Sequence, residues 1–269
     1  MDAWELARAA ATSAGIRLRA LGSLEDFDAA IEVMTATWGP YQLLPREVIT
    51  ALAHSGNVPW GAFDADRMIG FVLGWAGVDD DGLHVHSHML ATLPDRRHRG
   101  VGFALKLAQR AQALDQGIRV ARWTFDPLVA RNAWFNLGKL GATADRFGRS
   151  FYGEMTDDLN RGDRADRLVV RWDLEPQPGP RPIPGGLPTQ VRAVGDPPRP
   201  ERGEEPADGG ATIEVPRDHQ GLRTDDPDLG ARWRDAVAEA LEAGLGAGLV
   251  VSAFDRDRSA YVLTPRTDA

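Results

Sequence analysis

Residues 84–104, HVHSHMLATLPDRRHRGVGFA, join a histidine-bearing strand to a glycine-punctuated turn. His84, His86 and His88 follow at period two, so a strand would place the three imidazoles on one face. The turn has the pattern R-x-x-G-x-G over residues 97–102, and residues 103–116 have a helical pattern. Amides at a helix N-terminus favour anions, and glycine permits close approach. The stretch therefore predicts an anion cradle beside a row of bases.

The composition argues against several classes of protein and of functional site. Of the 269 residues, 43% are hydrophobic, which is enough for a packed core. The formal net charge of −8 argues against a dedicated binder of nucleic acid or of anionic membranes. The absence of cysteine excludes disulfides, thiolate zinc sites and a covalent cysteine intermediate. Because we see neither a signal-peptide pattern nor an apolar run of transmembrane length, we expect a cytoplasmic protein.

A proline-rich stretch separates two parts of the chain. Residues 176–206 hold 10 of the 18 prolines, and so polar a stretch cannot bury enough apolar surface to offset its ordering entropy. We predict a main domain over residues 1–174 and a Pro/Gly-rich linker or long loop over residues 175–210. A C-terminal α/β extension over residues 211–269 would be marginal alone, so we expect it to pack on the main domain.

The predicted fold class is α/β (α+β), with a mixed central sheet flanked by helices. Periodicity and turn residues predict the order β-α-α-β-β-β-α-β-α-β-β in the main domain. Its strands are expected at residues 16–21, 60–64, 68–76, 83–92, 120–125, 151–155 and 168–174, and its helices at 23–37, 45–53, 100–116 and 130–140. The extension is expected to hold a strand at 212–215, a helix at 228–245 and a hairpin of 249–254 with 260–263.

The element order and the RHRGVG turn resemble the GNAT superfamily of acyl-CoA N-acyltransferases, whose hallmark is [QR]-x-x-G-x-[GA] between a strand and a helix. Residues 123–142, WTFDPLVARNAWFNLGKLGA, are similar to that family's later strand and helix. The resemblance covers about residues 16–174 and implies a GNAT-like sheet that binds acetyl-CoA or succinyl-CoA as acyl donor, without a metal. It implies cofactor-binding roles for Leu90, Ala91, Thr92, Arg97, His98, Arg99, Gly100, Val101, Gly102, Phe103, Asn132 and Asn136.

Two closer resemblances concern the acceptor. The H-x-H of His86 and His88 is similar to that of arylalkylamine N-acetyltransferases, where such histidines are linked to deprotonating the amine. The stretches HSHMLATLP, TFDPL, FYGEM and DRLVVRW resemble a GNAT subgroup often associated with N-succinylamino-acid racemases. These resemblances imply a small-molecule amine or amino acid as acceptor, with neither nucleic acid nor membrane as partner, and they leave a homodimer open.

Amide formation from a thioester needs a neutral amine, donors for the oxyanion and an exit for the thiolate. We expect His88 to act as the base and His86 to relay the proton, in a direct transfer without an enzyme nucleophile. Many family members have a tyrosine at the position of Leu137, and that tyrosine acts as the acid for the departing thiolate. Tyr152 is the nearest substitute by type.

Further side chains are candidates for the acceptor site. Asp126, at the end of a predicted strand, could orient a histidine or bind the substrate ammonium. Arg167 could hold a carboxylate bidentately. Trp38 and Tyr41 lie between the first two helices, where GNAT enzymes usually shape the acceptor pocket.

Interpretations of these residues without a role in acyl transfer remain open. The three histidines could form a solvent-facing strand face or, because imidazole suits transition metals, a metal site. Asp126 could simply cap the helix that follows Pro127. At the level of the whole protein, a non-catalytic CoA-binding module and a metal-dependent hydrolase compete with the acyltransferase.

Overall fold

The structure is a computed structural model that describes residues 2–40, 43–96 and 99–266. The chain forms two compact units. The first unit comprises residues 1–123, 156–161 and 173–175, and the second comprises residues 124–155, 162–172 and 176–269. The class is mixed α/β, as predicted.

The first unit is built on an antiparallel sheet of order β1-β2-β3-β4, to which β5 adds in parallel. This arrangement confirms the predicted strands from the N-terminus to Trp123. Its elements are α1 (Ala3–Ser13), β1 (Arg17–Ala20), α2 (Leu24–Trp38), α3 (Arg46–His54), β2 (Trp60–Asp64), β3 (Arg67–Asp79), β4 (Gly82–Thr92), a 3-10 turn (Pro94–Arg96), α4 (Val101–Asp115) and β5 (Val120–Phe125), whose last two residues enter the second unit.

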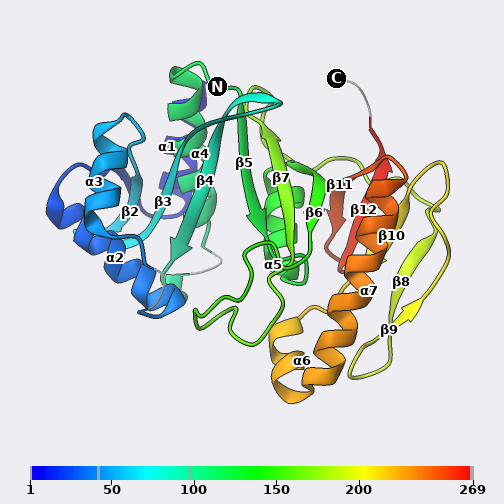
Figure 1. The fold of residues 1–269 in the computed structure, drawn as a ribbon. Helices are drawn as coiled ribbons and strands as arrows, with labels where there is room; N and C mark the ends of the chain where they lie inside the picture. The colour runs from blue at the N-terminus through cyan, green and yellow to red at the C-terminus, as the bar shows by residue number, and fades with distance from the viewer. Residues whose placement is uncertain (1, 41–42, 97–98, 267–269) are drawn as a thin grey trace. The chain divides into compact units, whose positions relative to one another are not determined.

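Helices cover both faces of the first sheet (Figure 1). Helices α2 and α3 lie on one face, while α4 lies on the other and packs against α1. A single hydrophobic cluster joins α2, α3, β2–β4 and the start of α4, with Phe27, Ile49, Phe71 and Leu105 among its most buried members. Since β3 and β4 lie between these layers, the strand that carries the histidines is fixed from both sides.

A reciprocal cap starts α2 where the sequence predicts it. The Ser23 hydroxyl accepts from the Asp26 amide at 3.2 Å, and Asp26 accepts from the Ser23 amide. Arg19 donates to both carboxylate oxygens of Asp26 and, with the amides of Gly22 and Ser23, lowers the pKa of that carboxyl to about 2 against the effect of burial.

The second unit has the strand order β7-β6-β11-β12-β10-β8-β9. Among the described residues of this unit, neighbouring strands pair antiparallel except β8 and β10, which pair in parallel. Its elements are α5 (Ala130–Ala133), a π-helical turn (Trp134–Lys139), β6 (Thr143–Gly148), β7 (Arg167–Asp173), β8 (Thr189–Val194), β9 (Arg199–Arg202), β10 (Ala211–Glu214), α6 (His219–Asp225), α7 (Pro227–Gly246), β11 (Leu249–Asp255) and β12 (Ala260–Pro265).

Three sequence predictions differ from the second unit. The strand expected at residues 151–155 is a turn, because Gly153 has φ +68, and the strand forms at β6 instead. The linker expected over residues 175–210 contains the hairpin β8–β9. The boundary expected at residue 174 is also displaced, because β6 pairs with β11 of the extension through Ala144 and Val251.

The helix expected over residues 130–140 widens into a π turn after α5. The ring of Trp134 lies over Gly138, where a Cβ would meet indole carbons at 2.1 and 2.3 Å. Only glycine admits this packing. Leu137, at the position of the family's tyrosine, is fully buried in that turn.

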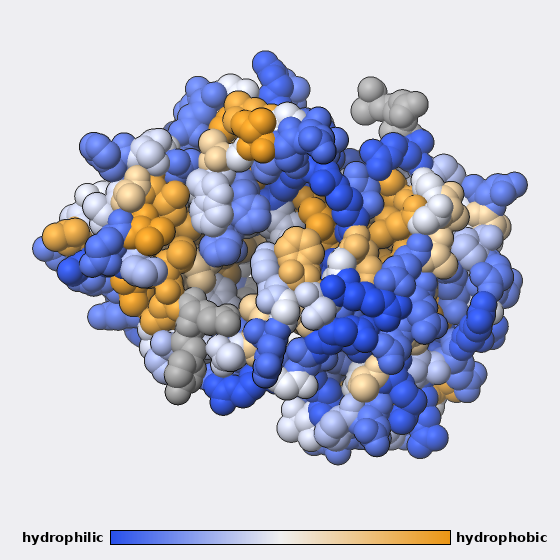
Figure 2. Space-filling view, viewed as in Figure 1, coloured by the Kyte–Doolittle hydropathy of each residue, from blue (hydrophilic) through white to orange (hydrophobic). Residues whose placement is uncertain are grey.

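The surface in view is mainly polar, in keeping with the charged composition (Figure 2). One apolar patch marks the tip of the β3–β4 hairpin, where Val78 is 79% exposed and Leu83 50% exposed.

Candidate active site

Strand β4 carries a bulge among its histidines. Leu73 of β3 faces Met89, but the next β3 residue, Gly74, faces Ser87. His88 is therefore an extra residue with no partner on β3, and a bulge of this kind re-aims the side chains around it. The sequence predicts strict alternation here and gives no signal of the bulge.

His86 and His88 nevertheless share one face, because both pack on Trp75 of β3. The ring centroids of Trp75 lie 5.0 Å from His86 and 4.8 Å from His88, and the two imidazoles are 5.7 Å apart. His88 is exposed, while His86 is half-buried. The predicted pairing of these two histidines is thus present, on an indole platform that the sequence analysis did not single out.

His84 is separately held near the tip of the β3–β4 hairpin. Its Nδ1 lies 3.1 Å from the carbonyl oxygen of Gly82 and 3.8 Å from the Asp79 carboxylate. Arg122 of β5, which pairs with His86 in the sheet, donates to Asp79 at 3.1 Å and to Asp81 at 2.6 Å. This network ties β5 to the hairpin and fixes where the histidine strand begins.

Both stacked imidazoles favour the neutral form. Burial lowers the pKa of His86 to about 4, with smaller contributions from the positive charges of His88, His84 and Lys106. Partial desolvation also lowers the pKa of His88, although the residue is exposed, because its ring lies against Trp75. At neutral pH the pair is therefore ready to accept a proton.

The depressed pKa of His86 predicts a pH-dependent loss of stability. Between pH 6.5 and about 4, the unfolded chain binds a proton at this residue and the folded chain does not, so the free energy of unfolding falls as pH falls through that window. His86→Asn should flatten this dependence in urea unfolding, whereas His54→Asn, at an exposed residue of α3, should leave it unchanged. An unaltered slope in His86→Asn would show that His86 is not desolvated.

The turn before α4, where the sequence predicts an anion cradle, is described from Arg99 onward. Gly100 is the N-cap residue of α4 in the left-handed region, with φ +86, and makes no side-chain cap. Arg99 and Gly100 are exposed, so the first amides of a 15-residue helix are open to an anion. Val101 is buried, and Gly102 and Phe103 are half-buried. Arg97 and His98 lie outside the described residues.

The edge of β4 between the histidines and the cradle faces away from β3. Leu90, Ala91 and Thr92 pair with Val72, Phe71 and Gly70 on one side. On the other side, within the described residues of the first unit, β4 pairs with β5 only at Val85 and His86. Beyond His86 this edge offers main-chain groups to a ligand.

Two predicted site residues of the second unit are engaged elsewhere, which corrects the sequence interpretation. Asp126 accepts from both terminal nitrogens of Arg234, at 2.6 and 3.0 Å, and from the Leu128 amide at 2.8 Å. It is thus committed to an ion pair and to the turn after Pro127. Arg167 is buried and donates to the Asp166 carbonyl oxygen, so it does not present a fork to a substrate carboxylate.

The remaining candidates of the second unit differ in exposure. Tyr152 is 45% exposed, and its hydroxyl lies 2.9 Å from the Thr124 hydroxyl. Asn132 is exposed, whereas Asn136 is buried in the π turn. Of these three, the exposed Tyr152 and Asn132 have polar groups that a ligand could reach.

Trp38 ends α2 and packs at the edge of the core. Residues 156–161 join it from far along the chain: the Asp158 amide donates to the Trp38 carbonyl oxygen at 3.1 Å. A Cβ on Gly39 would meet the Asp158 carboxylate at 2.3 Å, and the φ of +83 at Gly39 favours glycine there. Tyr41 lies outside the described residues.

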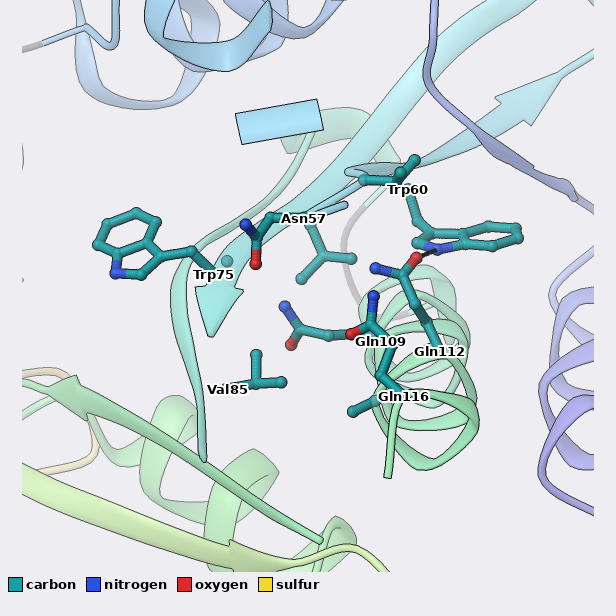
Figure 3. A pocket seen from close by; sticks show the side chains of 11 residues that line it. Asn57, Trp60, Trp75, Val85, Gln109, Gln112 and Gln116 are labelled. Carbon is teal, nitrogen blue, oxygen red and sulfur yellow. Dashed lines mark hydrogen bonds between the residues drawn. The ribbon is translucent and has the colours of Figure 1, made fainter. Parts of the chain in front are cut away.

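A small pocket lies beside α4 (Figure 3). Two glutamines of α4 and its C-cap residue Gln116 line it, and Gln112 accepts from the Trp60 indole at 2.5 Å. Trp75 points away from these amides (Figure 3). Because no lining residue is ionisable, this pocket offers no acid or base. The pocket is lined by Asn57, Val58, Trp60, Val72, Gly74, Trp75, Val85, Gln109, Gln112, Ala113 and Gln116.

Other classes of site find no support in the residues described. Among them, no group of three or more His, Cys, Asp or Glu could hold a metal ion. None of the helices that the structure describes is long and apolar enough to cross a membrane.

Comparisons with known proteins give a match to a family model and likenesses to solved structures. Residues 27–138 match the model of the Acetyltransferase (GNAT) family. The ribosomal-protein-S18-alanine N-acetyltransferase from Escherichia coli is similar in structure at 16% identity and TM-score 0.47, over 59% of this chain and 94% of that one. A putative GNAT acetyltransferase from Desulfovibrio desulfuricans gives 19% identity and TM-score 0.44, over 59% and 99%. Arabidopsis thaliana Naa50, in complex with a bisubstrate analogue, gives 14% and 0.45, over 58% and 97%. No curated protein shows a significant match.

Proposed function

We propose, from the match of residues 27–138 to the Acetyltransferase (GNAT) family, that the chain transfers an acyl group from acyl-CoA to the amine of a small molecule. The observation that carries the proposal is strand β4. It bears two imidazoles whose ring centroids lie 5.7 Å apart, pairs with β5 no further than His86 within the first unit, and leads to the start of α4 at Gly100, which has no side-chain cap.

The CoA portion of the donor would be held at the start of α4. Amides at the helix N-terminus supply partial positive charge to the pyrophosphate, and Gly100 lets it approach closely. The pantetheine arm would then run back along β4 and pair with those main-chain groups that point away from β3, such as the groups of Leu90, which alternate with the β3-bonded residues. This path brings the thioester toward the bulge at His88.

The histidines would manage the proton of the amine. An amine that attacks the thioester becomes acidic as its nitrogen bonds to carbon, so a neutral imidazole of low pKa can accept the proton. His88, which is exposed, is the first acceptor, and His86 behind it on Trp75 is the relay. Amides near Leu90 would stabilise the oxyanion.

The acceptor is proposed to be an amino acid or a similar small amine, with acetyl-CoA or succinyl-CoA as donor. This choice follows from the subgroup resemblance of HSHMLATLP and FYGEM. An assay that follows CoA release with the twenty amino acids and simple alkylamines tests it with both donors. Amine-dependent release would support the proposal, and its absence with every amine would contradict it.

A CoA-binding module without catalysis is the second candidate, because the chain has Leu137 in place of the family's tyrosine and buries it. Such a module would be stabilised by CoA species but would release no CoA in the presence of any amine. The same assay therefore separates the two functions.

Gly100→Val should abolish CoA binding. A β-branched residue is strained at φ +86, and even a plain left-handed conformation costs about 1–2 kcal/mol. Its side chain would also fill the approach to the α4 amides. A valine Cβ would meet only Ala14 at 3.6 Å, so the fold should persist. Isothermal titration with CoA measures the effect, with Gly117→Val, at the far end of α4, as control. Equal affinity in the Gly100 variant would place the pyrophosphate elsewhere.

A further inference from the structure

Lys106 of α4 is a buried cation without an anion. It is 2% exposed, and its Nζ donates to the Ser87 hydroxyl at 2.6 Å. Nζ lies 3.7 Å from the centroid of the Trp123 ring and 3.5 Å from Oε1 of Gln109. Among the described residues, no carboxylate forms an ion pair with it. Desolvating an ammonium in this way is costly, so its retention calls for a functional reason.

Ser87 lies between the two stacked histidines but points to the opposite face of β4. Its oxygen accepts the proton of Lys106, and the described residues provide no acceptor for its own hydroxyl hydrogen. The hydrogen is thus available to a group at the β4 edge. The positive charge of Lys106 contributes to lowering the pKa of His86 on β4. Arg122 of β5 is paired with Asp79 and Asp81 at the tip of the β3–β4 hairpin, and among the described residues neither of these carboxylates forms an ion pair with Lys106.

The pairing of β4 with β5 decides how far a ligand can extend along this edge. Within the first unit the last residue of β4 that faces a β5 partner is His86, and Ser87 is the next residue along the strand. From Thr92 to Ser87 the strand spans about 17 Å, which an extended pantetheine arm can cover. An acyl-CoA held at Gly100 would therefore place its sulfur beside Ser87.

We propose that Ser87 and Lys106 protonate the departing CoA thiolate, in the role left vacant by Leu137. This inference rests on the proposed acyl transfer. As the amine nitrogen bonds to the acyl carbon, the C–S bond breaks and its electron pair goes to sulfur. Sulfur takes the Ser87 hydroxyl proton, and Ser87 takes a proton from Lys106. The amine proton goes to a histidine, and exchange with solvent restores both groups.

The chemistry suits a lysine in this setting. Burial lowers the pKa of Lys106 to about 7, so the ammonium gives up its proton far more readily than a solvated lysine. Ser87 touches the sulfur and is the catalytic group, whereas Lys106 acts through Ser87 as a positioning residue and proton reservoir.

The thiol of bound CoA gives a direct test, because the chain has no cysteine and the thiolate absorbance belongs to CoA alone. Ultraviolet titration of the CoA complex should show that Lys106→Met raises the apparent pKa of the bound thiol by roughly 1–3, by removal of the neighbouring cation. Ser87→Ala should raise it as well. Gln112→Met, on the same helix, is the matched control. An apolar replacement of an unpaired buried cation should preserve the fold.

Turnover gives the second readout, with an amine from the release assay. Lys106→Met should lower kcat roughly 10²-fold while KM for acetyl-CoA stays unchanged. Unaltered thiol titration in Lys106→Met and Ser87→Ala, with CoA bound, would overturn this inference and leave the proposed function intact. A shift in Tyr152→Phe instead would also overturn it. Failure of the wild-type protein to bind CoA would reject both.

Discussion

Replacing both stacked histidines should abolish acyl transfer while CoA binding survives. We expect His86→Ala/His88→Ala to lower kcat by about 10²–10⁴-fold, the range for loss of a general base. The physical reason is that the imidazoles on Trp75 are the neutral bases on the face of β4, whereas the cradle at Gly100 lies beyond the strand. CoA release with a reactive amine measures the rate, and titration calorimetry with CoA measures binding.

His54→Ala is the matched control, since His54 is an exposed imidazole on α3 of the same unit. The single variants test whether the two histidines have different roles in proton transfer. A larger loss in His88→Ala than in His86→Ala would support His88 as the first proton acceptor. Full turnover in the double variant, with normal CoA affinity, would show that the histidine mechanism is wrong.

Arg234→Met should strongly destabilise the second unit. Arg234 is 3% exposed and binds the carboxylates of Asp126 and Asp163. Although burial raises the pKa of Asp163, Arg234 outweighs it and holds that pKa below its ordinary value. Loss of the guanidinium leaves two carboxylates without their main partner, at a cost of about 3–5 kcal/mol.

Urea unfolding followed by tryptophan fluorescence measures this loss, and Arg202→Met provides the comparison. Arg202 pairs with Glu205 on the surface, where both side chains are at least 70% exposed. Exposed pairs contribute about 0–1 kcal/mol. Similar unfolding midpoints for the two variants would mean that the Asp126–Arg234–Asp163 cluster does not stabilise the fold.

The sequence predicts the first unit well because its signals are local. The Ser23 cap, the hairpin turns and the glycine before α4 each act over a few residues, and the predicted strand at residues 120–125 coincides with β5. The second unit depends on distant partners. Strand β6 is stabilised by pairing with β7 and β11, and no pattern in its own residues predicts that pairing.

The distinction between local signals and distant partners also holds for the candidate site. The histidines and the R-x-x-G-x-G turn are visible as a pattern, and the family match to residues 27–138 agrees with it. Asp126 was an attractive candidate only because its partner, Arg234, lies 108 positions away. Trp75 packs against the imidazoles, and Lys106 donates to Ser87. The local sequence around Trp75 and Lys106 does not indicate these contacts, because each partner lies on a different element of the fold. The period-two spacing also conceals the bulge at His88.

Thermal unfolding of the purified protein with acetyl-CoA, succinyl-CoA and free CoA tests the central claim most directly. A ligand that binds only the folded state adds about 2.7 kcal/mol at roughly 100 times its dissociation constant. We predict a clear rise in Tm with at least one CoA species, lost in Gly100→Val, and the more stabilising thioester identifies the donor. No rise in Tm with any CoA species, for a protein that unfolds cooperatively, would contradict acyl-CoA as its ligand.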